Sequence, residues 1–382
     1  MSAMIPVAKP LLGEEEAAAA GRAILSGWVT QGPEVEAFER EWAGLVGAPH
    51  ACAVSSCTTA LHLALLTLGV QSGDEVITVS HSFIATANAI RYCGAVPVFV
   101  DIEPGTFNIN PLLIEAAITP RTRAILCVHQ LGMPCDLPSL IAIGKTHGLP
   151  VIEDAACAIG SEILWNNEWQ MIGKPHADIC CFSLHPRKVI TTGDGGMLTT
   201  ANAEWDARFR LLRQHSMSVS DKERHSSKQI IFESYPTLGF NYRMTDPQAA
   251  MGREQLKRLP GILKRRRELG TRYHELLGGI AGVITPHQPK WARSNWQSYC
   301  IRLPFGINQV AVMQSMLDDG ISTRRAVMCA HREEACADIP LPHSLLESER
   351  AQDTAIVLPL YAQMTDAEQD RVVESLRRAL KK

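Results

Sequence analysis

The sequence predicts an α/β fold built on a mostly parallel sheet. From about residue 50, short β-rich runs alternate with amphipathic stretches, and the runs are apolar throughout rather than at every second position. Strands of that kind are buried on both faces and are joined by right-handed helical crossovers. Gly69, Gly94 and Gly148 each follow an apolar helical stretch, where a left-handed residue would close a helix.

Two helices are expected ahead of the sheet. They cover EEEAAAAGRAILSG (14–27) and PEVEAFEREWAGLVG (33–47), and the short loop WVTQG (28–32) joins them. Pro33 opens the second helix at a first-turn position that proline tolerates.

The repeated strand and helix units follow in order. Apolar runs predict strands, and the stretches between them predict helices. The strand runs are HACAVS (50–55), EVITVS (75–80), VPVFVD (96–101), RAILCV (123–128) and LPVIED (149–154). The helical stretches are TTALHLALLTLG (58–69), ATANAIRYCG (85–94), PLLIEAAI (111–118) and LPSLIAIGKTHG (137–148).

The pattern changes after DICCFS (178–183) and the glycine-rich strand GDGGML (193–198). The polar segment 216–229 predicts a mobile surface loop of poor order. A long helical pattern over 248–279 follows, and Pro260 should break or kink it. The charged run from Lys264 to Arg267 is typical of a solvated face.

Two domains are expected from 382 residues. Residues 1–250 would form the large α/β domain, including the N-terminal helices. Strands such as SYCIRL (298–303) and shorter helices indicate a smaller α+β domain over 251–382.

Composition excludes several classes of function. The net charge of −3 gives no basic footprint for nucleic acid and no polybasic membrane anchor. No run approaches the roughly 18 apolar residues of a membrane span, and the start carries carboxylates where a signal peptide is apolar. A cytoplasmic protein is expected.

The 11 cysteines contain no CxxC pair, so a disulfide framework or a zinc site is disfavoured. Most of them lie in apolar runs and are assigned to packing, and no metal site is expected.

Polar residues at predicted strand ends are the candidates for chemistry, because ligands of parallel sheets bind beyond the carboxyl ends of the strands. Asp154 ends one strand, Ser183 ends another and is followed by Lys188, and Cys57 and Thr58 open a helix. Pyridoxal phosphate needs this combination: a lysine to hold it as a Schiff base, an acid for its pyridine nitrogen, and donors for its phosphate. Taken singly, each residue is as typical of a helix cap or a solvated side chain.

Recognisable motifs sharpen this hypothesis. The segments GWVTQGPEVEAFE, VIEDAACAIGS, FSLHPRKVITTGDGGM, GFNYRMTDPQAAMGREQLKRL and LPLYAQMTDAEQDRV resemble the DegT/DnrJ/EryC1/StrS family of pyridoxal-phosphate-dependent sugar aminotransferases in order and spacing. The resemblance covers essentially the whole chain. It implies fold type I of the pyridoxal enzymes: a large domain with a mostly parallel sheet of about seven strands, and a small C-terminal domain.

The resemblance also implies roles for individual residues. Lys188 corresponds to the Schiff-base lysine and Asp154 to the partner of the pyridine nitrogen. Ser183, Cys57 and Thr58 correspond to phosphate ligands.

Two further positions match residues that border the cofactor in the family. Phe83 matches the aromatic residue that stacks on the pyridine ring, although apart from the family it is typical of a core residue. Asn241 resembles the residue that reaches the phosphate from the neighbouring subunit, which implies a homodimer with shared active sites.

Other positions depart from the family pattern or match it loosely. Cys157 replaces the usual glutamine or histidine beside the cofactor 3-hydroxyl, where packing is the alternative role, and Asp194 replaces a glutamate. His331 is a candidate near the substrate, with an exposed surface histidine as the alternative.

The loop residues Trp28, Thr30 and Gln31 match a family loop near the substrate. His129 and His185 are assigned structural roles.

The implied reaction is a reversible transamination. L-Glutamate, the expected donor, would load the cofactor with an amino group, and the cofactor would aminate a keto carbon of a nucleotide-linked deoxysugar. A cyclitol ketone as acceptor remains open. The presence of Lys188 argues against a sugar dehydratase, and the intact set of site residues argues against a non-catalytic regulator.

Overall fold

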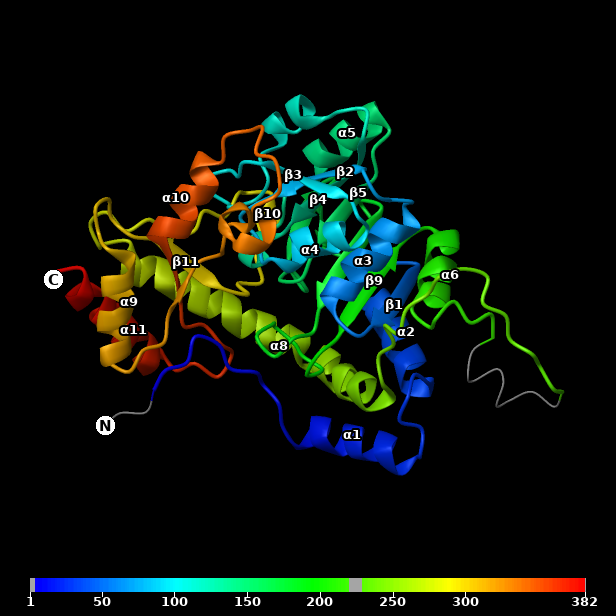
Figure 1. Ribbon diagram of the computed structural model, residues 1–382. Coiled ribbons are helices and arrows are strands. Elements are labelled where there is room, and N and C mark those ends of the chain that lie inside the picture. Colours follow the sequence, from blue (N-terminus) through cyan, green and yellow to red (C-terminus); the bar gives the residue numbers. More distant parts are fainter. Residues whose placement is uncertain (1–3, 220–228, 382) are drawn as a thin grey trace.

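The computed structural model describes residues 4–219 and 229–381. The loop predicted over 216–229 therefore lies largely outside the described residues. The chain forms a large α/β lobe and a C-terminal lobe, and the long helix α8 (Asp246–Leu277) runs beneath both of them (Figure 1).

The large lobe is organised by a seven-stranded sheet with the order β1-β9-β8-β5-β4-β2-β3. Only β9 runs antiparallel to its neighbours, so the predicted mostly parallel sheet is confirmed. The strands are β1 (His50–Val54), β2 (Glu75–Val79), β3 (Val96–Val100), β4 (Thr122–Val128), β5 (Val151–Asp154), β8 (Ile179–Ser183) and β9 (Gly196–Thr200).

Both faces of this sheet are covered by helices, as its continuous apolar strands require. The helices of the lobe are α1 (Glu14–Leu25), α2 (Pro33–Val46), α3 (Cys57–Thr67), α4 (Ala85–Tyr92), α5 (Leu137–His147) and α6 (Ala203–Leu212). The three predicted stop glycines, Gly69, Gly94 and Gly148, have φ values of 78°, 73° and 65°. These values lie in the left-handed region that ends helices, so the stop signals are confirmed.

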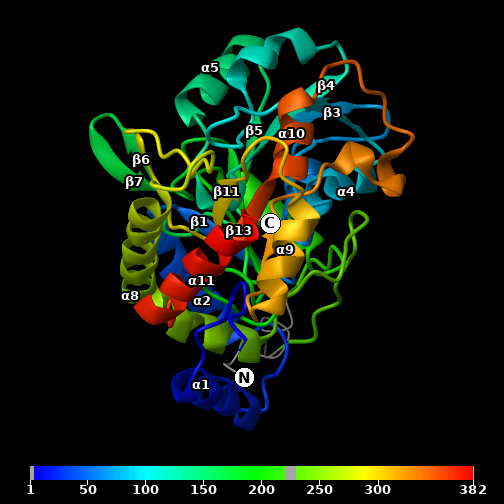
Figure 2. The same cartoon turned by 90° about the vertical axis from the view of Figure 1, so that its left-hand side faces the viewer.

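The C-terminal lobe has its own hydrophobic cluster and a three-stranded sheet with the order β11-β13-β12. Figure 2 shows this lobe with its outer helices toward the viewer. Its strands are β11 (Tyr299–Arg302), β12 (Arg324–Arg325) and β13 (Ala355–Leu358), and its helices are α9 (Gln309–Asp318), α10 (Leu346–Thr354) and α11 (Asp366–Ala379).

A second small sheet, β10-β6-β7, lies beside the large one. Its strands are β6 (Glu162–Trp165), β7 (Glu168–Met171) and β10 (Ala292–Arg293). Ile5 near the N-terminus pairs with Ile321 of the C-terminal lobe. The division at residue 250 stays a prediction; that position lies within α8.

The predicted break at Pro260 is wrong, because α8 continues through it as one helix. The buried neighbours Leu259, Ile262 and Leu263 pack against the large lobe and keep this stretch helical.

The solvated face predicted for Lys264 to Arg267 is also wrong for Arg266, whose side chain is buried. Its guanidinium donates to the carbonyl oxygens of Trp296, Gln297 and Leu360, at 3.0, 2.7 and 3.2 Å. This arginine therefore ties helix α8 to the C-terminal lobe.

None of the helices in the described residues is long and apolar enough to cross a membrane. All 11 cysteines are free, and all except Cys93 and Cys157 are buried.

Candidate active site

Lys188 lies in a tight turn just beyond the carboxyl end of β8. The His185 ring accepts the backbone N–H of Arg187 at Nδ1 (3.2 Å), and the Lys188 N–H donates to the His185 carbonyl oxygen (2.8 Å). Gln255 of helix α8 accepts the N–H of Thr191 at 3.2 Å. These bonds fix the position of Lys188 relative to the sheet, and they give His185 the structural role predicted for it.

Asp154 ends strand β5, the parallel neighbour of β8, so both strands deliver their polar ends to the same edge. One carboxylate oxygen accepts the Thr86 hydroxyl at 2.8 Å, and the other accepts the Ala156 N–H at 3.1 Å. The Cys57 thiol approaches the same carboxylate at 4.0 Å. The turn after β5 brings Cys157 into the site, where its sulfur lies 3.2 Å from the Lys188 amine.

Burial acts on both charged groups of this edge. It raises the pKa of the Asp154 carboxyl, and the Thr86 hydroxyl, the Ala156 N–H and the Lys188 ammonium offset only part of that rise. Burial lowers the pKa of Lys188, but Cys157, Cys57 and Asp154 outweigh it, so this pKa is raised. Asp154 is thus a buried acid whose ionised form gains from a further cation.

The first turn of α3 borders this edge. The Ser56 hydroxyl caps the helix by accepting the Thr59 N–H at 3.2 Å. The backbone N–H groups of Cys57 and Thr58 precede the first hydrogen bond of the helix, so neither has a partner within it. Gly196 of β9 permits a close approach, because a Cβ there would lie 2.4 Å from the Ser56 carbonyl oxygen. The Ser183 hydroxyl, at the end of β8, accepts only a long bond of 3.4 Å from the His185 N–H. Free amides at a helix start and a nearby hydroxyl are typical anion donors.

Phe83 belongs to the loop after β2, and its ring is 63% exposed. The alternative of a core residue is therefore wrong. Thr86, in the first turn of the following helix α4, donates its hydroxyl to Asp154, so the segment that carries Phe83 borders the buried acid. Thr86 was missed from sequence; its position three residues after Phe83 is the signal that could have pointed to it.

His331 is almost fully buried, so the alternative of an exposed surface histidine is wrong. Its Nδ1 lies 2.6 Å from the Ser80 hydroxyl, and its Nε2 lies 3.1 Å from a Glu349 carboxylate oxygen. The His331 N–H also donates to Ser80 at 3.0 Å. His331 thus joins the C-terminal lobe to the loop that carries Phe83, through two partners that the sequence did not indicate.

Trp28, Thr30, Gln31 and Asn241 have contacts with segments other than the Lys188 turn. The Trp28 indole donates to the Gln31 carbonyl oxygen at 3.1 Å, and the Thr30 carbonyl oxygen accepts the N–H of Asp246 at the start of α8. Asn241 is exposed and forms an isolated bridge with Gln214. Among the described residues, no hydrogen bond connects Thr30 or Asn241 to Lys188 or Asp154.

His129 is buried, and both ring nitrogens are bonded. Its Nε2 lies 2.9 Å from Glu153, and its Nδ1 accepts the Cys135 N–H at 2.9 Å. This arrangement agrees with the structural role predicted for it.

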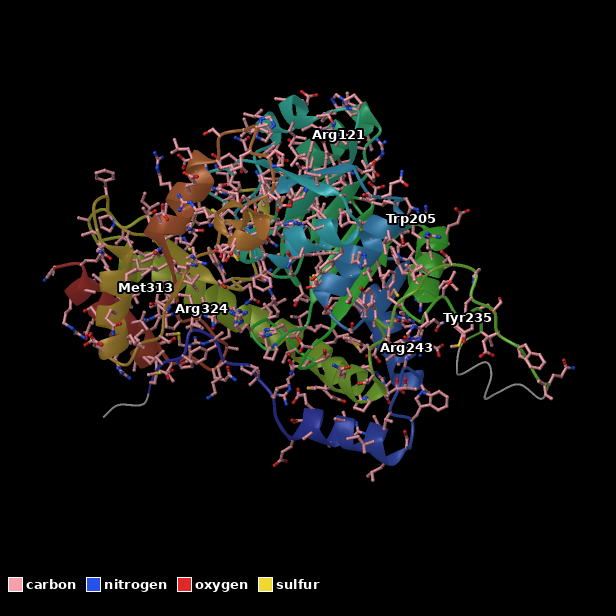
Figure 3. The ribbon with its side chains drawn as sticks, in the orientation of Figure 1. Arg121, Trp205, Tyr235, Arg243, Met313 and Arg324 are labelled. Carbon is pink, nitrogen blue, oxygen red and sulfur yellow. The ribbon has the colours of Figure 1, made fainter. Side chains whose placement is uncertain are left out.

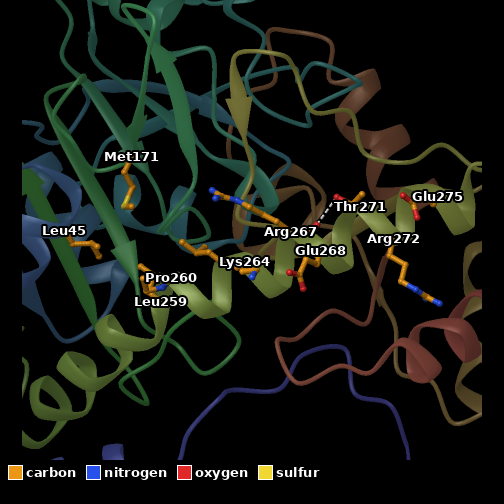
Figure 4. A pocket seen from close by; sticks show the side chains of 11 residues that line it. Leu45, Met171, Leu259, Pro260, Lys264, Arg267, Glu268, Thr271, Arg272 and Glu275 are labelled. Atoms are coloured by element: carbon orange, nitrogen blue, oxygen red, sulfur yellow. Dashed lines mark hydrogen bonds between the residues drawn. The ribbon is translucent and has the colours of Figure 1, made fainter.

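A hollow of about 860 Å³ lies away from these residues, along the outer face of α8 (Figure 4). Leu45, Met171, Lys264, Arg267 and Glu275 are among its lining residues. None of the predicted site residues lines this hollow, so its volume does not identify it as the active site.

Comparison with known proteins gives this geometry a context. The model of the DegT/DnrJ/EryC1/StrS aminotransferase family matches residues 10–377. The spore coat polysaccharide biosynthesis protein SpsC of Bacillus subtilis is 38% identical over 387 aligned positions, which cover 99% of this chain and 97% of SpsC.

Two solved structures are similar over almost their full lengths. DesI, crystallised in the presence of its TDP-sugar product, has a TM-score of 0.89 at 30% identity, covering 100% of this chain and 94% of DesI. The PLP-form of the sugar aminotransferase Spr1654 from Streptococcus pneumoniae has a TM-score of 0.90 at 27% identity, covering 99% of both chains.

The family model, the close relative and the shared architecture agree with one another. The chain therefore belongs to the DegT/DnrJ/EryC1/StrS family, and it is an aminotransferase with the type I fold of pyridoxal-phosphate enzymes.

Proposed function

We propose that this enzyme uses pyridoxal phosphate to transfer an amino group from an amino acid, with L-glutamate as the expected donor, to a keto carbon of a nucleotide-linked deoxysugar. The observation that carries this proposal is the placement of Lys188 and Asp154. Asp154 is buried and Lys188 is half-buried at one edge of the sheet, next to groups that can donate hydrogen bonds to an anion.

The residues present fit the cofactor. Asp154 is a buried acid whose ionised form is only partly stabilised by the nearby Lys188, so a protonated pyridine nitrogen would suit it. The amides of Cys57 and Thr58 and the Ser183 hydroxyl suit a phosphate. The exposed ring of Phe83 offers an apolar face beside the acid.

When bound, the cofactor supplies an electron sink for the α-carbon of the amino donor and for the keto carbon of the acceptor. Lys188 would hold it covalently and, once released, would take the proton from the substrate carbon as a base and return it as an acid. Asp154 would keep the ring nitrogen protonated. The Cys157 thiol, 3.2 Å from the Lys188 amine, would orient that amine.

Two of the relatives support the acceptor class. DesI was solved with a TDP-sugar product, and SpsC is described as a polysaccharide biosynthesis protein. Both descriptions are consistent with a sugar acceptor that carries a nucleotide.

A homodimer with shared sites is part of the proposal. Asn241 faces solvent in one chain, and the segment before it extends away from the body of the molecule (Figure 3, where Tyr235 is labelled). This segment carries exposed apolar side chains that a second copy would cover: Ile230, Phe232, Tyr235 and Leu238.

The first test is the visible absorption of the purified protein with pyridoxal phosphate. We expect a yellow band that L-glutamate bleaches, because glutamate loads the cofactor with its amino group. Lys188→Ala should lack the covalent band and turnover, while the control Lys290→Ala, an exposed loop residue, should behave as wild type. Turnover of Lys188→Ala near that of wild type would overturn the proposal.

Subunit mixing tests the shared site. Lys188→Ala and Asn241→Ala proteins would each be inactive, and exchange of subunits would rebuild one site with both residues. Recovery of activity supports Asn241 acting across the interface, and no recovery contradicts it.

A further inference from the structure

Two arginines border the Lys188 turn without an acidic partner. Neither Arg187 nor Arg324 has a carboxylate oxygen within ion-pair distance among the described residues. Arg325, next along the chain from Arg324, does have one, since its guanidinium lies 3.2 Å from Glu333. These two arginines therefore carry positive charge next to the Lys188 turn that no carboxylate of the described residues neutralises.

Arg187 is held in a fixed turn. It directly precedes Lys188, its N–H donates to His185, and its carbonyl oxygen accepts the Gln297 side chain at 2.6 Å. Gln297 belongs to the segment that Arg266 anchors through backbone carbonyls. The Arg187 backbone is therefore tied to both lobes, while its side chain is exposed.

Arg324 approaches from the C-terminal lobe. It lies on β12, paired with Val357 of β13, and successive residues of a strand face opposite sides. The chain then runs to Cys329, which bridges His81 in the loop bordering the site. In Figure 3 Arg324 lies between Met313 of α9 and the large lobe.

The charges of the two lobes meet here. Partial loss of solvent around the Arg187 guanidinium lowers its pKa, and the neighbouring Arg324 lowers it further. The pKa of His185 is lowered by partial burial and by Arg187, Lys188 and Arg324, while Asp194 opposes this shift. Two positive charges near each other repel, which raises the free energy of the charged forms of Arg187 and Arg324. An anion bound between them would replace this repulsion with attraction.

We propose that Arg187, from the large lobe, and Arg324, from the C-terminal lobe, together bind the diphosphate of the nucleotide-linked acceptor. This inference rests on the proposed function, and it adds two specificity-determining residues to it. Arginine suits the role because its planar fork bonds phosphate oxygens in pairs.

The position of the pair favours a diphosphate over the donor carboxylate. The α-carboxylate of an amino acid is attached to the carbon that reacts, so it must lie next to the Lys188 amine. A nucleotide sugar carries its two phosphates beyond the anomeric carbon of the ring. Both arginine side chains are exposed, at the rim of the site rather than beside the buried amine.

The test measures binding of thymidine diphosphate and of inorganic pyrophosphate to the holoenzyme by calorimetry. Arg187→Gln and Arg324→Gln should each weaken binding of both probes about tenfold or more, as loss of a charge-assisted bond does. The matched control is Arg325→Gln, which removes the neighbouring guanidinium that Glu333 already neutralises and should leave binding unchanged.

A second measurement separates the two anions. The rate at which L-glutamate bleaches the holoenzyme should be unchanged, within about twofold, in Arg187→Gln and Arg324→Gln. A slowed glutamate reaction with unchanged thymidine diphosphate binding would overturn the proposal and assign the pair to the donor carboxylate. Equal binding of both probes by all variants would also overturn it.

Failure of the proposed function would look different. If glutamate had no effect on the wild-type holoenzyme while diphosphate binding still depended on both arginines, the transamination would be refuted. The arginine pair would then stand as a phosphate site without its assigned substrate.

Discussion

Two buried carboxylates, Asp154 at the end of β5 and Glu39 on helix α2, differ in whether nearby arginines stabilise their ionised form. Burial raises the pKa of both groups. At Glu39 the guanidinium groups of Arg213 and Arg210 outweigh burial, so its pKa is lowered. At Asp154 no arginine does so, and its pKa is raised.

The Glu39 site is complete within the chain. One carboxylate oxygen lies 2.5 Å from Arg213 and accepts the Ala53 N–H at 2.8 Å, while the other lies 2.6 Å from Arg210. Arg213 also donates to the Ala53 carbonyl oxygen at 2.6 Å. This network ties α2, β1 and α6 together and leaves no charge to offer a ligand.

The Asp154 carboxylate, by contrast, has no arginine to neutralise its charge. Its oxygens accept neutral donors from Thr86 and Ala156, and its nearest cation is a lysine that the proposed reaction moves. A buried acid that the chain leaves without a fixed cation is typical of a binding site. The difference between the two acids separates a structural charge from a functional one.

The largest expected effect is on catalysis at Asp154. Asp154→Asn should lower turnover by roughly two to four orders of magnitude, because losing one member of a buried ion pair with the cofactor costs about 3–5 kcal/mol. The measurement is single-turnover reaction of the holoenzyme with L-glutamate. The melting temperature of the unloaded protein should not fall, since Asp154 has no fixed counter-ion there. An unchanged rate would show that another group protonates the ring.

The next effect is on stability at Glu39. Glu39→Gln should lower the free energy of unfolding by about 3–5 kcal/mol, because Arg213 is left buried without its acid. Urea unfolding followed by circular dichroism measures this, and activity per folded molecule should be retained. Glu36→Gln on the same helix is the control, since Glu36 forms an exposed pair with Arg40 worth about 0.3–0.5 kcal/mol. Equal losses in both variants would contradict the contrast between the two sites.

The two acids also predict opposite pH dependences in the unloaded protein. Glu39 has a folded pKa below its ordinary value of 4.5, so its contribution is present above pH 4.5 and is lost as the pH falls through the folded pKa. Asp154 has a folded pKa above 3.8, so it holds its proton longer when folded and its contribution declines as the pH rises from 3.8 through the folded pKa.

Unfolding free energies measured across this pH range in each variant check the signs. Glu39→Gln should reduce the loss of unfolding free energy that occurs as the pH falls. Asp154→Asn should remove the decrease in unfolding free energy that occurs as the pH rises above 3.8. A steeper acid loss in Glu39→Gln than in wild type would refute the assignment of Glu39.

Much of the fold was predictable because it depends on local patterns. The apolar runs predicted the strands of the large sheet, and the glycine stops predicted helix ends that have positive φ. The errors lie at 111–118, where two short 3-10 segments (Pro111–Leu113 and Glu115–Ala117) replace the predicted helix, and in helix α8. Pro260 continues the helix because neighbouring apolar residues pack against the core, and Arg266 is buried because distant carbonyl oxygens meet it.

The site divides in the same way. Lys188, Asp154, Ser183 and Cys57 were predicted from sequence because each follows a strand end or opens a helix, and parallel strands bring such ends to one edge. Cys157 was predicted only through the family resemblance. Thr86, Ser80, Glu349 and the pair of Arg187 and Arg324 were missed. Their partners come from segments far apart in the chain, and no local pattern records that meeting.

The sequence by itself thus determined the order of strands and helices and the family motifs, and it indicated the lysine and the acid proposed for the cofactor. These depend on residue type and spacing along a few turns of chain. Only the tertiary structure decided which charges are neutralised. Arg213 forms an ion pair with Glu39, whereas the charge nearest to Arg187 from the C-terminal lobe is another arginine, Arg324. Whether a charged group has an opposite or a like charge beside it depends on which distant segments pack together.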